Sequence, residues 1–178
     1  MSTVEKAAKS VPDIVPDIAV SKLTGTSNYF EDFTVGQKMR HARGATVDEV
    51  ENNFISKQVM NTAQAHWNEH FMPPGPMGTG RLVFGLITGS MVFGLASQDV
   101  AENALAELGC TALRFRSPVH HGDTLYALTE VLAIEDSDRR DAGVVRFRHW
   151  GITHEDRLVF EGERLVLLKR RSHWSPNA

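Results

Sequence analysis

Four histidines gather in two short stretches of the sequence and could either bind a metal ion or move protons. His66 and His70 are four residues apart, and His120 and His121 are adjacent. A zinc site needs three or four ligands in tetrahedral order. No H-E-x-x-H arrangement is present, and two consecutive prolines (73 and 74) soon end any helix. We therefore expect no metal, and the histidines remain candidates for proton transfer near neutral pH.

The composition predicts an ordinary soluble protein. The 178 residues suffice for one domain with a proper core, and 42% apolar with 23% charged residues is the usual balance. A net charge of -3 favours neither a nucleic-acid nor a membrane partner. The single cysteine, Cys110, cannot form an internal disulfide. Residues 1–20 contain no continuous apolar segment of a secretion signal, so we expect a cytoplasmic protein.

The chain divides into an arm, a domain and a tail. Pro12 and Pro16 exclude a regular helix near the start, so residues 1–27 are expected to form an extended arm. This arm is either disordered or laid across a neighbouring subunit. The domain is expected to span residues 28–171, and residues 172–178 form a tail.

Two helices are predicted in the first half of the domain. Thr46 and Glu49 form a T-x-x-E capping box, so a helix should begin at Val47, with Val50 and Phe54 on its inner face. Residues 72–80 hold three prolines and three glycines and must form a loop. Residues 81–97 follow, apolar on nearly every side, and predict a helix that is buried all round.

Strands are predicted on both sides of the long helix. A short strand is expected at residues 38–42, and others at 112–119, 124–134, 143–151 and 157–168. In the fourth of these, Val145, Phe147 and His149 alternate with Arg146 and Arg148. One strand, a buried helix and then a run of antiparallel strands predict an α+β domain whose sheet wraps around a central helix, the hot-dog fold.

Three phrases of the sequence carry a family resemblance: Tyr29-Phe30-Glu31-Asp32-Phe33-x-Val35-Gly36, Asn61-Thr62-Ala63-Gln64-Ala65-His66 and Arg114-Phe115-x-x-Pro118-Val119-x-x-Gly122-Asp123-Thr124. Together they resemble the MaoC-like dehydratases, the family of the (R)-specific enoyl-CoA hydratases. The first phrase resembles the family's opening, the second lies where the family carries D-x-N-P-L-H, and the third resembles its strand–turn signature. The resemblance spans about residues 28–170. With Met60 before it, the middle phrase is similar to the branch that hydrates itaconyl-CoA and mesaconyl-CoA.

The resemblance implies the roles of two catalytic candidates. His66 matches the family histidine that shuttles protons when water adds to an enoyl thioester. Asn61 stands where the family has a catalytic aspartate; an amide is no base at neutral pH, but it can orient a water molecule. Glu69 is the nearest carboxylate in the sequence. The alternatives are a His66 packed with its nitrogens satisfied and an Asn61 that caps a loop.

The resemblance also implies binding residues for the thioester. Gly80 matches the glycine that opens the central helix, where a backbone N–H would meet the thioester oxygen. Thr88 takes the place of a small hydroxyl residue near the family's pocket, or bonds back to the carbonyl of Phe84. Arg81, Arg114 and Arg116 are candidates for a substrate carboxylate or for the phosphates of coenzyme A.

The resemblance leaves three functions open. The first is reversible hydration of a short branched or dicarboxylic enoyl-CoA, with no cofactor beyond the coenzyme A of the substrate, by a homodimer or dimer-based oligomer. The second is a non-catalytic acyl-CoA-binding or partner subunit, which the replacement at Asn61 favours. The third, a thioesterase, is disfavoured because residues 81–96 contain no acidic side chain.

Overall fold

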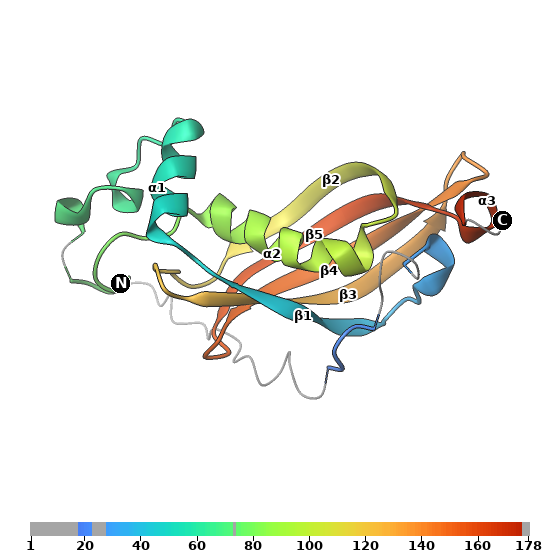
Figure 1. Ribbon diagram of the computed structural model, residues 1–178, viewed down its shortest axis with the longest axis horizontal. Helices are drawn as coiled ribbons and strands as arrows, with labels where there is room; N and C mark the ends of the chain where they lie inside the picture. The colour runs from blue at the N-terminus through green and yellow to red at the C-terminus, as the bar shows by residue number, and fades with distance from the viewer. Residues whose placement is uncertain (1–17, 23–27, 73, 176–178) are drawn as a thin grey trace, which may run out of the picture.

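The computed structural model describes residues 18–22, 28–72 and 74–175 and contains a five-stranded antiparallel sheet with one long helix across it (Figure 1). The order of strands in the sheet is β1-β3-β4-β5-β2. The predicted α+β arrangement is therefore confirmed. The elements, in chain order, are η2 (Phe30–Asp32), β1 (Lys38–Thr46), α1 (Glu49–Gln58), η3 (Gln64–His66), η4 (Glu69–Phe71), α2 (Gly85–Val100), β2 (Ala104–Phe115), β3 (Thr124–Asp136), β4 (Ala142–Thr153), β5 (Leu158–Lys169) and α3 (Arg171–Trp174).

The core lies between α2 and the inner face of the sheet. The alternation predicted in the later strands is confirmed, because Val145, Phe147 and His149 of β4 are fully buried. The helix can approach closely because Gly89 faces Phe160: a Cβ atom at this position would lie 2.9 Å from the ring. Ile87, Val92 and Ala96 fill this interface from the helix. Fully burying an aliphatic side chain contributes about 1.5–3 kcal/mol.

A chain of four buried polar side chains joins the end of α2 to the sheet. The Nδ1–H of His41 donates to the Asp99 carboxylate at 2.6 Å, and Thr129 lies 2.6 Å from the other ring nitrogen of His41. His149 Nδ1 lies 2.8 Å from the same hydroxyl. With both rings neutral, the His149 Nδ1–H donates to Thr129, whose hydroxyl donates to His41. Each bond of the chain then has one donor and one acceptor.

The described part of the predicted arm lies on its own chain. The Ser21 N–H donates to the Arg40 carbonyl, and the Arg40 N–H donates to the Ala19 carbonyl. Ile18 packs on an apolar cluster on the second face of the sheet, formed by Leu128, Trp150, Ile152 and Leu158. Residues 18–22 therefore lie against β1 and the sheet of their own chain. Residues 1–17 and 23–27 lie outside the described part.

The first helix begins later than expected. Asp48, not Thr46, caps it, and the capping box is Asp48 with Glu51. Thr46 is the last residue of β1, where its hydroxyl bonds to that of Thr124. The predicted inner face is also wrong: Val50 and Phe54 are 71% and 63% exposed. Of the three apolar side chains, Val47, which precedes the helix, is the one that is buried.

The central helix and its following strand also differ from the expected bounds. Leu82 and Val83 are extended, because they pair with His120 and Val119, and α2 starts at Gly85. The helix is not buried on all sides, since Leu86, Ser90 and Gly94 form an exposed stripe. The strand β2 starts at Ala104 rather than at residue 112 and ends before Pro118.

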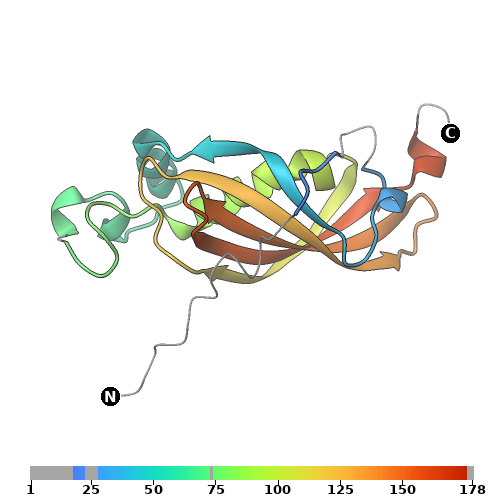
Figure 2. The same ribbon diagram turned by 90° about the horizontal axis from the view of Figure 1, so that it is seen from below.

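The two ends of the sheet carry different small elements (Figure 2). The segment from α1 to η4 overhangs one end, and η2 and α3 lie at the other. Within α3, Trp174 donates from Nε1 to the Asp141 carbonyl at 3.1 Å, so residues 172–174 of the expected tail are packed on the domain. Among the described residues, no helix is long and apolar enough to cross a membrane.

Candidate active site

A cavity of about 420 Å³ lies where the overhanging segment meets the start of α2. We call it the His66 cavity. It brings together His66 from η3, the N-terminal turn of α2 with Gly85 and Thr88, and the segment after β2. Its other lining residues are Met77, Leu82, Val83, Phe84, Phe115, Arg116, Ser117, Pro118, Val119 and Val159. The structure thus brings three of the predicted site residues, His66, Thr88 and Arg116, to one place.

The hydrogen bonds of His66 define which of its nitrogens is free to act. Its Nδ1 lies 3.1 Å from the backbone carbonyl of Leu82. A carbonyl oxygen only accepts, so the Nδ1 carries the proton and donates it to Leu82. In the neutral ring, Nε2 is then an unprotonated acceptor. Phe84 packs against the imidazole, with ring centroids 5.3 Å apart. A histidine with this fixed tautomer can take a proton from water.

The N-terminus of α2 lines the same cavity through Gly85 and Thr88. The first amides of a helix have no partner inside the helix, and the helix dipole makes this end positive. Gly85 is the first residue of α2, and a Cβ atom there would lie 2.9 Å from the ring of Phe115. A glycine is therefore needed for Phe115 to close against the helix start.

The structure corrects the predicted place of Gly80. It lies five residues before α2, with a φ angle of +83° that favours glycine, and therefore does not open the helix. It lines a separate polar cavity with Glu49, Glu69, Arg81, Thr79, His120 and His121. Gly85 holds the position that the sequence analysis gave to Gly80.

The three candidate arginines are in different surroundings. Arg116 lines the His66 cavity and pairs with Glu161 at 2.6 Å. Arg114 pairs more loosely with the same carboxylate, at 3.6 Å, and is not among the residues that line the cavity. Arg81 is held by Glu49 and Glu69 in the polar cavity. Of the three candidate arginines, Arg116 alone lines the His66 cavity.

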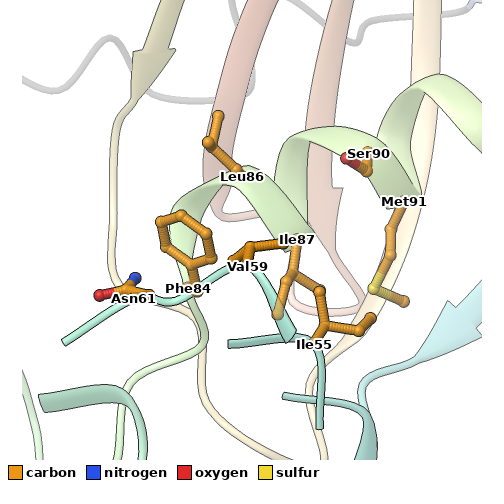
Figure 3. A pocket seen from close by; sticks show the side chains of 8 residues that line it. All are labelled: Ile55, Val59, Asn61, Phe84, Leu86, Ile87, Ser90 and Met91. Carbon is orange, nitrogen blue, oxygen red and sulfur yellow. The ribbon is translucent and has the colours of Figure 1, made fainter. Parts of the chain in front are cut away.

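Asn61 does not line the His66 cavity. It lies at one end of a larger cavity of about 690 Å³, which we call the apolar cavity (Figure 3). Phe84 lines both cavities and lies between the two halves of the site. The Oδ1 of Asn61 accepts from the Ala63 N–H at 2.9 Å, an Asx turn that caps the loop. The remaining lining residues are Ile55, Val59, Leu86, Ile87, Ser90 and Met91.

The remaining candidates are Glu69, as a carboxylate near the base, and the histidines, as metal ligands. Glu69 pairs with Arg81 and lines the polar cavity, not the His66 cavity. Among the described residues that line the His66 and apolar cavities, none is acidic. In the part of the chain that the structure covers, no three His, Cys, Asp or Glu side chains are grouped to hold a metal ion.

One buried residue next to the site, Asn52, was not predicted from the sequence. Asn52 of α1 is fully buried and bonds to the backbone carbonyls of His66 and Leu82. Its partners lie 14 to 69 residues away in the chain, so no local pattern marks it.

The family comparison matches nearly the whole chain. A family model described as mesaconyl-CoA hydratase covers residues 3–170. The chain is 32% identical over 157 residues to a β-methylmalyl-CoA dehydratase of Chloroflexus aurantiacus, covering 81% of this chain and 44% of that protein. It is 26% identical over 158 residues to a mesaconyl-CoA hydratase of Cereibacter sphaeroides, covering 86% and 44%. The chain thus spans less than half the length of these curated relatives.

Solved structures agree with the fold. A MaoC domain protein of Chloroflexus aurantiacus matches with a TM-score of 0.75 and 29% identity, over 83% of this chain and 46% of the other. A protein of Mycobacterium tuberculosis with a double hotdog fold matches with a TM-score of 0.62 and 24% identity, over 83% and 46%. The fold is therefore a hot dog. With the match over residues 3–170, the chain belongs to the mesaconyl-CoA hydratase family.

Proposed function

We propose that this chain is a hydro-lyase that adds water reversibly to a short branched or dicarboxylic enoyl-CoA, such as mesaconyl-CoA or itaconyl-CoA. The observation that carries the proposal is the His66 tautomer. With Nδ1 bonded to Leu82, the ring has an unprotonated Nε2, and it lines the same cavity as Gly85, the first residue of α2. The names of the curated relatives support the same class of reaction and substrate.

The chemistry needs one base and one set of oxygen ligands. The His66 Nε2 takes a proton from water while the water oxygen bonds to the β-carbon of the thioester. The electrons of the double bond move toward the thioester oxygen, and the enolate there accepts from the amides of the helix start, at Gly85. The imidazolium then gives its proton to the α-carbon. One base on one face of the substrate gives syn addition and regenerates the neutral ring.

The proposal assigns no proton transfer to Asn61. Its Oδ1 already accepts from Ala63, so only the amide N–H₂ is available to a substrate or a water molecule. Thr88, which is 2% exposed and one turn into α2, lies on the same side of the helix as Gly85 and can bond to the thioester. Arg116 is assigned the distal carboxylate, which distinguishes a dicarboxylic substrate from a simple enoyl-CoA.

We further propose that two copies of this chain form a homodimer. Three apolar surfaces of the single chain remain exposed: β2 at the edge of the sheet, the Leu86 stripe of α2 and the outer face of α1. Their large members are Leu108, Leu113, Phe115, Leu86, Val50 and Phe54. Contiguous exposed apolar surface often marks an interaction site. Coverage of 46% of a chain with a double hotdog fold supports a pairing of two hot-dog domains.

The test is an assay of the purified protein with a panel of thioesters: crotonyl-CoA, mesaconyl-CoA and itaconyl-CoA. We expect a product heavier by one water with a C5 dicarboxylic thioester, and slower turnover of crotonyl-CoA. If no thioester is hydrated although the protein binds them, the non-catalytic acyl-CoA-binding subunit is the better account. Release of free coenzyme A without hydration would instead indicate a thioesterase.

A further inference from the structure

Asn52 is a fully buried carboxamide on α1 that bonds to four groups around the His66 cavity. Its Nδ2 lies 2.7 Å from the His66 carbonyl and 3.2 Å from the Leu82 carbonyl. Its Oδ1 accepts from the Phe84 N–H at 2.9 Å. Because a backbone N–H only donates, the orientation of the carboxamide is fixed.

These partners are the groups on which the proposed chemistry depends. The Leu82 carbonyl accepts from both Asn52 and the Nδ1 of His66, so it sets the tautomer of the base. The His66 carbonyl fixes the backbone that carries the ring. Phe84 is the residue before Gly85, so its bond to Asn52 orients the peptide that leads into the helix start. One side chain thus bonds to the backbone that carries the base and to the residue that precedes the start of α2.

The last contact of Asn52 is with His121, whose Nε2 lies 3.1 Å from Nδ2. Nδ2 has two N–H groups for three acceptors, so one N–H is shared between two of them, and a bond to His121 requires that its Nε2 is unprotonated. Burial, together with the positive charge of Arg81, lowers the pKa of His121, which favours the neutral ring that this bond requires. All polar atoms of Asn52 are therefore satisfied by protein groups, and none is left for a substrate.

We propose that Asn52 is a positioning residue for the hydration reaction. It holds the His66 Nε2 at a fixed place relative to the backbone N–H of Gly85. This inference rests on the proposed function. Asn52 does not line the His66 cavity or the apolar cavity, so it touches neither water nor thioester. Its loss should misplace the base without removing any substrate contact.

The expected effect is therefore on kcat and not on KM. Misplacing a reacting group by about 1 Å can cost on the order of 100-fold in rate. We expect Asn52→Asp, which keeps the shape and loses both N–H donors, to lower kcat by roughly that factor with little change in KM. The control is Asn53→Ser, at the next residue on α1, whose Oδ1 has no hydrogen-bond partner among the described residues; it is compared with Asn52→Ser and should keep the wild-type kcat.

A second readout does not depend on activity. Nitrogen-15 NMR of the histidine rings distinguishes an Nδ1–H from an Nε2–H ring. We expect His66 of the wild type to be Nδ1–H and the ring of Asn52→Asp to become a mixture of the two. If Asn52→Asp does not fold, Asn52→Ser takes its place, because the smaller serine side chain cannot reach both the carbonyls of His66 and Leu82 and the N–H of Phe84.

The outcomes separate the two proposals. An active wild type whose kcat and His66 tautomer are both unchanged by the substitution overturns the role of Asn52 and leaves the proposed function standing. A wild type without hydratase activity contradicts the proposed function. In that case the NMR arm decides alone: a mixed tautomer in the Asn52 variant supports positioning, and an unchanged Nδ1–H ring overturns it.

Discussion

The Nδ1–H of His66 donates to the backbone carbonyl of Leu82 at 3.1 Å, and this bond leaves Nε2 as the free acceptor of the ring. Leu82 lies in the extended segment that leads into α2, so the base and the helix amides are attached to the same short stretch of backbone. The proposed chemistry depends on this connection, because His66 moves the proton while the start of α2 stabilises the negative charge of the enolate.

Arg116 and Arg114 form a matched pair for testing how the substrate anion is bound. Both pair with Glu161, but only Arg116 lines the His66 cavity. We expect Arg116→Gln to raise KM for a dicarboxylic thioester by about 10-fold or more, since a lost charge-assisted hydrogen bond costs about 1.5–3 kcal/mol. KM for crotonyl-CoA should change less. Steady-state kinetics of the two variants checks this.

Arg114→Gln is the control and should keep the wild-type KM for both thioesters. An equal rise in KM in the two arginine variants would show that the pair acts only through Glu161 and the sheet surface. An Arg116→Gln variant with unchanged KM for every dicarboxylic thioester would place the anion elsewhere.

The buried polar chain predicts a dependence of stability on pH. Burial lowers the pKa of His149 well below its usual range, and burial lowers that of His41 against the opposing effect of Asp99. Below about pH 6.5 these two histidines bind protons in the unfolded chain but stay neutral in the folded protein, where they are buried. The unfolded state then binds more protons, so the free energy of unfolding falls as the pH drops below that value.

The variant His149→Asn isolates one histidine of this chain. An asparagine amide can still donate to Thr129 but does not titrate. Between about pH 7.5 and pH 5.5, we expect it to lose about 1.4 kcal/mol less stability than the wild type. Urea unfolding at the two pH values measures this, with the exposed His70→Asn as the control. Identical losses in wild type and His149→Asn would mean that this ring is protonated in the folded protein.

The proposed homodimer depends on the exposed stripe of α2. Leu86 is 51% exposed in the single chain and lies next to the apolar cavity. We expect sedimentation to give the mass of two chains for the wild type and of one chain for Leu86→Arg, because a buried unpaired charge is costly. Val35→Arg, at a position that is 59% exposed and precedes β1, should remain dimeric. A wild type that sediments as one chain would contradict the proposal.

Local patterns predicted the sheet better than the helix boundaries. The alternation in β4 is a short-range signal, and Val145, Phe147 and His149 are buried as expected. The start of α2 depends instead on pairs far apart in the chain: Leu82 with His120, and Val83 with Val119. These pairs keep the segment extended, although its apolar side chains fit a helix. Gly80 was therefore assigned a position that Gly85 holds.

The first helix shows how two similar motifs compete. Thr46-x-x-Glu49 and Asp48-x-x-Glu51 both fit a capping box. Thr46 is held in the β1–β3 ladder opposite Thr124, so Asp48 caps the helix. This pairing spans 78 residues and leaves no local trace in the sequence. Asn52 was missed for the same reason, since its role appears only when η3, the segment before α2 and His121 come together around it.

The most direct test of the central claim is the hydration rate of His66→Ala with the thioester that the wild type uses best. General acid–base catalysis contributes about 100- to 10,000-fold, so we expect kcat to fall by at least about 100-fold while the variant stays folded. His70→Ala, four residues on and exposed, should keep the wild-type rate. A folded His66→Ala variant that hydrates the thioester at the wild-type rate would contradict the assignment of His66 as the base.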